Sequence, residues 1–143
     1  MPSYQSLVTF FQEAIPQARD LGFCIDHIEQ GQVSGHADFQ PFMIGNPEDQ
    51  LLNGGILSTL IDNISGITAF TTIGTIEAVV TLDLRIDYMR PAVADQTIHV
   101  SAECYRKTAN IVFIKAAAWQ QADKPVAHSV STFMLANPQL AAP

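Results

Sequence analysis

The segment from Gly54 to Ile73 constrains the fold more than any other part of the chain. Apolar residues recur through it at helical spacing, which predicts a long helix over 54–73. The other side of this helix carries mostly small or polar residues, whereas a helix on a protein surface normally presents several Lys and Glu side chains to water. We therefore expect the helix to be enclosed on nearly all sides, with one acidic residue, Asp62, on its less apolar side.

The rest of the chain predicts a sheet around this helix. Alternating apolar and polar residues predict four long strands and one earlier strand pair; the strands span 79–89, 96–107, 111–121 and 125–135, and the pair lies within 23–39. A run of neighbouring strands with one dominant helix indicates an α+β protein, in which an antiparallel sheet wraps around the long helix. The length of 143 residues fits a single domain over 1–143.

Shorter elements complete the pattern. Helical spacing over 4–15 predicts a helix that Ser3 caps and Pro16 ends. Proline and glycine interrupt residues 40–53, which predicts a loop long enough to carry function. Strand 79–89 is expected to present a single apolar face, made of Leu82, Leu84, Ile86 and Tyr88.

The chain has few charged residues for its size. Only 15% of its residues are charged, against about 25% in a typical soluble domain, and 48% are hydrophobic. The mean hydropathy is +0.16. A small domain with so few charged residues exposes apolar surface, and contact with another copy of the chain would bury that surface. We therefore expect a homo-oligomer, either a homodimer or a homotetramer built as a dimer of dimers.

The charge balance and the motif content exclude several classes of function. The net charge of −7 leaves no basic stripe for nucleic acid. The sequence has no uninterrupted apolar run of about 18 residues, so no membrane-spanning helix is predicted. The first residues do not resemble a signal peptide, and a cytoplasmic protein is therefore expected. Isolated cysteines and histidines predict no metal site, and no cofactor is expected. The G-x-S-x-G motif of serine hydrolases is absent from the sequence.

Asp62 is the first candidate for chemistry. A carboxylate within an apolar helix is costly unless it is hydrogen-bonded or neutralised, so a catalytic and a structural role both stand open. Gly54 and Gly55 follow Asn53 at the predicted start of the helix, where glycine leaves backbone N–H groups unshielded for a carbonyl or an oxyanion. The alternative is that the glycines permit close packing of the helix end and that Asn53 caps it.

The spacing of these candidates indicates how they would cooperate. Gly55 and Asp62 are seven residues apart, close to two turns, so they lie on one side of the helix and about 10 Å apart along its axis. One acyl group does not reach both positions in a single subunit. If Gly55 polarises a carbonyl and Asp62 activates water, the two residues meet across a two-fold axis, each from a different protomer.

Three parts of the sequence carry a resemblance to a known family: Asn46, the run 52–65 and the run 81–92. Together they resemble the hotdog-fold acyl-CoA thioesterases of the phenylacetate-pathway type, a group that includes the enzymes similar to thioesterase superfamily member 2. The likeness extends from about residue 20 to residue 136. It implies the hotdog fold, in which an antiparallel β-sheet wraps around a long central helix, and the hydrolysis of an acyl- or aryl-CoA thioester to free acid and CoA.

The resemblance also implies roles for individual residues. Asp62 matches an acid that serves as general base or nucleophile, and Gly55 matches a glycine whose N–H binds the thioester oxygen. Asn46 matches a loop asparagine that helps to place water or substrate, and Thr81 matches a hydroxyl that orients the water. In the family, the asparagine and glycine come from one subunit, and the acid and hydroxyl come from the other. Further substrate contacts are expected from Asn53, Gly54 and Ser58, and contacts to CoA phosphates from Arg90, Arg106 and Lys107, for which solubilising charge is the alternative.

One residue departs from the family pattern. The family usually has histidine before the glycine pair, and this chain has Asn53, which keeps a donor and an acceptor but does not titrate near neutral pH. We therefore expect a changed rate or substrate, and a non-catalytic acyl-CoA or fatty-acyl binding protein stands as the alternative to a hydrolase. A hotdog dehydratase would need a dyad of histidine and a carboxylate, and this segment has no histidine. A purely structural dimerisation module would need neither the enclosed Asp62 nor the glycine pair at the start of the same helix.

Overall fold

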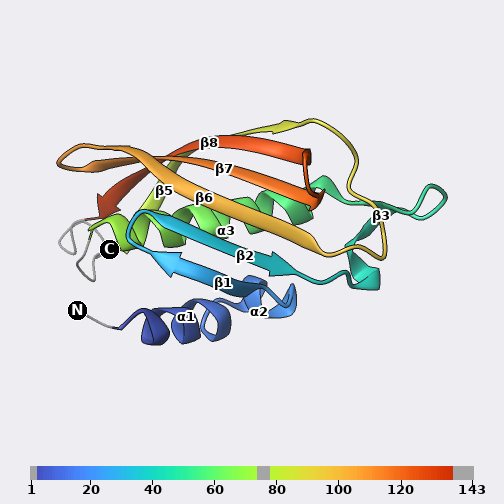
Figure 1. The fold of residues 1–143 in the computed structure, drawn as a ribbon, viewed down its shortest axis with the longest axis horizontal. Coiled ribbons are helices and arrows are strands. Elements are labelled where there is room, and N and C mark those ends of the chain that lie inside the picture. The colour runs from blue at the N-terminus through green and yellow to red at the C-terminus, as the bar shows by residue number, and fades with distance from the viewer. Residues whose placement is uncertain (1–2, 74–77, 137–143) are drawn as a thin grey trace, which may run out of the picture.

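The computed structural model describes residues 3–73 and 78–136, and six long strands and one long helix dominate it (Figure 1). The chain runs through α1 (Tyr4–Glu13), α2 (Pro16–Asp20), β1 (Cys24–Glu29), β2 (Gln32–Ala37), η1 (Pro41–Met43), β3 (Ile44–Asn46), β4 (Leu51–Leu52), α3 (Gly54–Ile73), β5 (Ala78–Tyr88), β6 (Ile98–Lys107), β7 (Ile111–Gln121) and β8 (Lys124–Ala136). The elements follow the predicted order.

The long strands form one sheet in the order β1-β2-β6-β7-β8-β5, and each neighbouring pair is antiparallel. Figure 1 shows α3 running along one face of this sheet. Alternation decides which residues face the helix: in β6, Ile98 and Val100 are buried, while His99 between them is only partly covered. The core between helix and sheet also contains Met43, Leu60, Ile61, Ile64, Ile67, Val112, Ile114 and Phe133.

Helix α3 has the predicted bounds, but its own chain covers only part of it. Nine of its residues are buried, whereas Asp62, Asn63 and Gly66 are half-buried. Helix α1 covers part of the remaining surface, where Phe11 packs edge-on against Phe70 at 5.5 Å between ring centroids. Among the described residues, α3 is the one helix that is long and apolar enough to cross a bilayer, with a mean hydropathy of 1.3. Its packing against the sheet makes it the core helix of this fold.

The structure corrects three local predictions. Ser3 does cap α1, since its Oγ accepts from the Ser6 N–H at 3.2 Å, but Pro16 begins a second helix, α2. Proline suits a first helical turn because its fixed φ is helical and no N–H is needed there. The loop predicted over 40–53 contains η1 and the β3–β4 hairpin.

The third correction concerns β5. A β-bulge between Thr81 and Asp83 leaves Leu82 without a partner in β8, so Leu82 is 52% exposed rather than aligned with Leu84. A bulge adds one residue to one strand of a pair and reverses the alternation of side chains beyond it. The alternation predicted for strand 79–89 therefore holds only for its second half.

The two edges of the sheet differ. At the β1 edge, α1 lies alongside the strand (Figure 1), and Gln12 Oε1 accepts from the Ile25 N–H at 2.9 Å. At the β5 edge, Val80 and Leu82 are each about half exposed. A long edge strand with exposed apolar residues is a template for pairing with another chain.

Candidate active site

Asp62 and Thr81 are brought together by the packing of α3 on β5. Asp62 lies on α3 and is half-buried, and its Oδ1 accepts a hydrogen bond from Thr81 Oγ1 at 3.0 Å. The bulge in β5 makes this contact possible. Thr81, Leu84 and Ile86 all pair with the odd-numbered residues of β8 that face the helix, which a regular strand would not permit.

The start of α3 holds the second group of candidates. The N–H of Gly55 donates to Asn53 Oδ1 at 2.7 Å, so the side chain of Asn53 caps the helix. A Cβ added to Gly55 would lie 2.9 Å from the same Oδ1. Ser58 Oγ and Thr59 Oγ1 both donate to the Gly55 carbonyl, at 3.0 and 2.8 Å. The hydroxyl of Ser58 is thus engaged with its own helix.

A pocket of about 400 Å³ opens beside this helix end. It is lined mainly by the last residue of β5 and the segment after it, together with residues at the start of α3: Leu52, Gly54, Leu57, Tyr88, Met89, Arg90, Pro91 and Ala92. Tyr88 closes it against the helix, because its hydroxyl donates to the Gly54 carbonyl at 3.3 Å. The sequence pattern placed Tyr88 on the apolar face of its strand but did not single it out as functional; the spacing that it shares with Leu84 and Ile86 was the available signal.

Asn46 has a local role in the structure. Its Oδ1 accepts from the N–H groups of Glu48 and Asp49, at 3.1 and 3.2 Å, and its Nδ2 donates to Asp49 Oδ2 at 3.1 Å. These bonds build the turn of the β3–β4 hairpin. The hairpin itself packs closely on the start of α3, since a Cβ on Gly45 would lie 2.9 Å from the Cα of Asn53. Asn46 is therefore tied to the hairpin and bonds neither Asp62 nor Gly55.

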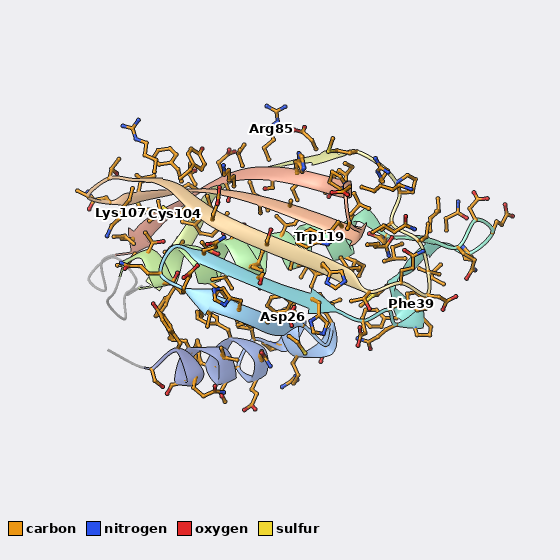
Figure 2. The ribbon with its side chains drawn as sticks, viewed as in Figure 1. Asp26, Phe39, Arg85, Cys104, Lys107 and Trp119 are labelled. Carbon is orange, nitrogen blue, oxygen red and sulfur yellow. The ribbon has the colours of Figure 1, made fainter. Side chains whose placement is uncertain are left out.

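The three basic candidates lie at opposite ends of α3. Arg90 lines the pocket at the helix start. Lys107 Nζ donates to the Thr72 carbonyl at 3.3 Å near the helix end, and the neighbouring Arg106 lies 5.8 Å from the ring centroid of Phe113. Figure 2 shows Lys107 at one extremity of the molecule. Thr72 is eighteen positions beyond Gly54, which corresponds to about 27 Å along the helix axis. One chain therefore does not unite these charges around one phosphate group.

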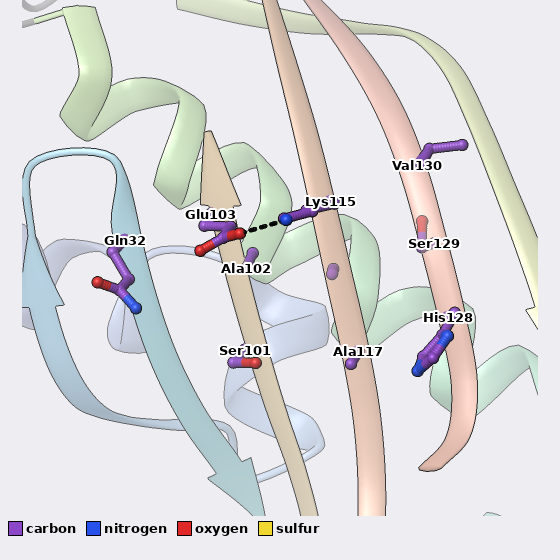
Figure 3. A pocket seen from close by; sticks show the side chains of 10 residues that line it. Gln32, Ser101, Ala102, Glu103, Lys115, Ala117, His128, Ser129 and Val130 are labelled. Atoms are coloured by element: carbon purple, nitrogen blue, oxygen red, sulfur yellow. Dashed lines mark ion pairs between the residues drawn. The ribbon is translucent and has the colours of Figure 1, made fainter. Parts of the chain in front are cut away.

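A second cavity, of about 430 Å³, lies on the sheet face that points away from α3 (Figure 3). Its lining includes Gln32, Ser101 and His128, and an ion pair joins Lys115 Nζ to Glu103 Oε1 at 2.6 Å. The sequence did not predict this cavity. Among the residues that the structure describes, no three His, Cys, Asp or Glu side chains are grouped to hold a metal.

The architecture, an antiparallel sheet packed around one long helix, is that of the hotdog fold. The model of the thioesterase superfamily matches residues 49–127, which is more than half of the chain. The chain belongs to this superfamily, and both the predicted fold class and the predicted family are confirmed.

Solved structures agree with the family. A protein from Pseudomonas aeruginosa is 33% identical, with a TM-score of 0.80 over 92% of this chain and 98% of that one. The Escherichia coli PaaI protein from the phenylacetic acid degradation operon is 20% identical, with a TM-score of 0.83 over 94% and 93%. A putative thioesterase of Ralstonia eutropha, described as related to phenylacetic acid degradation, is 22% identical, with a TM-score of 0.77 over 93% and 100%. No curated protein matches the chain.

Proposed function

We propose that this chain is an acyl-CoA thioesterase that hydrolyses an acyl- or aryl-CoA thioester to the free acid and CoA. One observation carries the proposal: in a chain of the thioesterase superfamily, a half-buried carboxylate on the central helix, Asp62, accepts a hydrogen bond from Thr81 Oγ1 at 3.0 Å. A surface carboxylate would need no such partner, and a carboxylate held by one oxygen keeps the other for a water molecule.

In the proposed reaction, Asp62 is the general base. It takes a proton from a water molecule whose oxygen attacks the thioester carbon, and the carbonyl electron pair moves onto the oxygen. The C–S bond then breaks, and the CoA sulfur leaves with the proton that Asp62 returns. Thr81 acts by holding Oδ1 of the carboxylate, so that Oδ2 faces the water. General base catalysis of this kind typically contributes about 10²–10⁴-fold in rate.

The N–H of Gly55 is the proposed donor to the thioester oxygen. It lies in the first turn of α3, where the helix dipole favours negative charge, and donors to a developing oxyanion commonly contribute about 10²–10³-fold in kcat. Asn53 Oδ1 occupies this N–H at 2.7 Å, so the substrate oxygen has to displace it. Asn53, Gly54, Ser58 and Asn46 stay predictions as substrate or water contacts, and Asn46 would first have to leave its turn.

The proposed active unit is a homodimer paired through β5. Gly55 and Asp62 are about 10 Å apart along one helix, so the site takes Gly55 from one subunit and Asp62 with Thr81 from the other. The exposed apolar residues of the β5 edge and the low charge of the chain support pairing there. Association of two such dimers into a tetramer and a cytoplasmic location complete the proposal.

An antiparallel dimer also bears on CoA binding. If Gly55 of one subunit faces Asp62 of the other, the two α3 helices run in opposite directions. The end of one helix, near Arg106 and Lys107, then lies toward the start of the other, near Arg90. Along the helix axis, the distance between these positive charges would fall from about 27 Å within one chain to about 13 Å between subunits, which suits the several phosphates of CoA.

The test is the release of free thiol from a panel of acyl- and aryl-CoAs. We expect the Asp62→Asn variant to lose at least about 10²-fold in kcat, because an amide cannot accept the proton. Asp20→Asn is the control, since Asp20 is an exposed carboxylate at the end of α2, away from β5, and it is expected to match the unmodified chain. Undiminished turnover by Asp62→Asn would remove Asp62 from the mechanism.

A second function, binding of acyl-CoA without hydrolysis, has one observation in its favour. Asn53 replaces the expected histidine and its Oδ1 occupies the Gly55 N–H, which the reaction needs. Calorimetric titration with the same CoA panel separates the two functions. Tight binding with no thiol release from any member decides for a binding protein.

A further inference from the structure

The peptide group that joins Gly54 to Gly55 is held from both sides. Its N–H donates to Asn53 Oδ1 at 2.7 Å, and its carbonyl accepts from the Tyr88 hydroxyl at 3.3 Å. The two bonds come from different parts of the chain, because Asn53 precedes α3 and Tyr88 is the last residue of β5. This is the same peptide group whose N–H is proposed to bind the thioester oxygen.

The register of the sheet places Tyr88 over the helix start. Leu84, Ile86 and Tyr88 share the side of β5 that faces α3, and Tyr88 pairs with Ala127 near the end of the sheet. The ring lies directly against Gly54, since a Cβ added there would be 3.4 Å from Cε1 and 3.7 Å from Cζ of Tyr88. Even so, the side chain of Tyr88 is 53% exposed and lines the pocket of about 400 Å³.

This exposure bears on what the hydroxyl does. A buried tyrosine needs a partner for its O–H, but a half-exposed one can bond water at no cost to folding. A bond to the Gly54 carbonyl is therefore not required to satisfy Tyr88. At 3.3 Å it is longer than the usual 2.5–3.0 Å for O–H···O, and hydrogen bonds of catalytic sites are often long until substrate binds.

We propose that Tyr88 is a positioning residue that orients and polarises the Gly54–Gly55 peptide as the donor to the thioester oxygen. Donation to a peptide carbonyl draws electron density toward its oxygen and makes the N–H of the same group a stronger donor. Negative charge that develops on the substrate oxygen would strengthen both bonds together. Tyr88 thus acts through Gly55 and touches the reacting atoms only by way of that peptide. The inference rests on the proposed thioesterase function.

The test compares Tyr88→Phe, which keeps the ring against Gly54 and removes only the hydroxyl, with Tyr105→Phe. Tyr105 is a matched control because it is 52% exposed, lies on β6 and packs beside Phe113. One neutral hydrogen bond corresponds to about a 2- to 12-fold change, so kcat of Tyr88→Phe is expected to fall by that factor, with KM within about twofold and the same oligomeric state by light scattering.

A second measurement does not depend on turnover. In ¹⁵N-labelled protein without substrate, the amide proton of Gly55 should move upfield in Tyr88→Phe and stay in place in Tyr105→Phe, because the carbonyl loses its donor. If the unmodified chain releases no thiol, the proposed function fails, and the Gly55 shift still tests the polarisation. An unmoved Gly55 amide, an unchanged kcat, or a loss confined to KM overturns the role proposed for Tyr88.

Discussion

Removal of the Asn53 side chain tests whether the helix cap competes with the substrate. Asn53 Oδ1 accepts from the Gly55 N–H at 2.7 Å, and the thioester oxygen of the proposed substrate needs that same donor. Two effects then oppose each other. Asn53→Ala weakens the folded protein because the helix loses its cap, and it improves substrate binding because the donor is no longer occupied.

Both magnitudes follow from the geometry. Loss of an N-cap side chain typically costs about 1 kcal/mol, which should lower the Tm of a chain of this size by about 4 °C. A hydrogen bond contributes about 0.5–1.5 kcal/mol net. In Asn53→Ala, substrate binding no longer has to break the bond to the Gly55 N–H, so it becomes more favourable by that free energy. If chemistry is slower than substrate release, KM should fall by about 2- to 12-fold.

The assay is steady-state thiol release together with thermal unfolding of the same samples. Asn53→Asp is the matched variant: it keeps the acceptor and adds a negative charge that suits a helix N-terminus, so Tm is expected to hold or rise. Its charged oxygen should bind the Gly55 N–H more tightly and raise KM. Competition between the cap and the substrate is refuted if Asn53→Ala lowers Tm while KM stays constant or rises. A rise in KM would instead make Asn53 a direct substrate contact.

Two further outcomes follow from the same site. Thr81→Val removes the hydroxyl that donates to Asp62 and should lower kcat by about 10-fold. Thr81→Ser keeps the hydroxyl and should retain most of the kcat of the unmodified chain. Equal rates in both variants would contradict a role for this bond. Leu82→Lys places a charge on the β5 edge and should yield a monomer by light scattering, without thioesterase activity. Phe10→Lys, at an exposed position of α1, is the control and should leave a dimer. A fully active monomer would show that one chain suffices.

Local regularity explains what was predictable. The bounds of α3 follow from a helical period that begins after a capping residue, and the strands follow from alternation, so helix and sheet could be read from neighbouring residues. Asp62 and Gly55 stood out as a carboxylate in an apolar helix and a glycine at its start, and Thr81 was chosen for its resemblance to a family motif, so none of the three needed coordinates. The prediction for Pro16 was wrong because proline is compatible both with the end of one helix and with the first turn of the next. Only the packing of the chain distinguishes these two positions.

The sequence by itself determined one helix, one sheet and the residues worth testing, because periodicity and motif spacing are properties of adjacent positions. Only the tertiary structure decided which of those residues meet. Thr81 reaches Asp62 because a bulge in β5 reverses its side-chain alternation, and Tyr88 reaches Gly54 because the sheet ends over the start of α3. Such contacts join residues 19 and 34 positions apart. They depend on register and helix packing, which no single segment encodes.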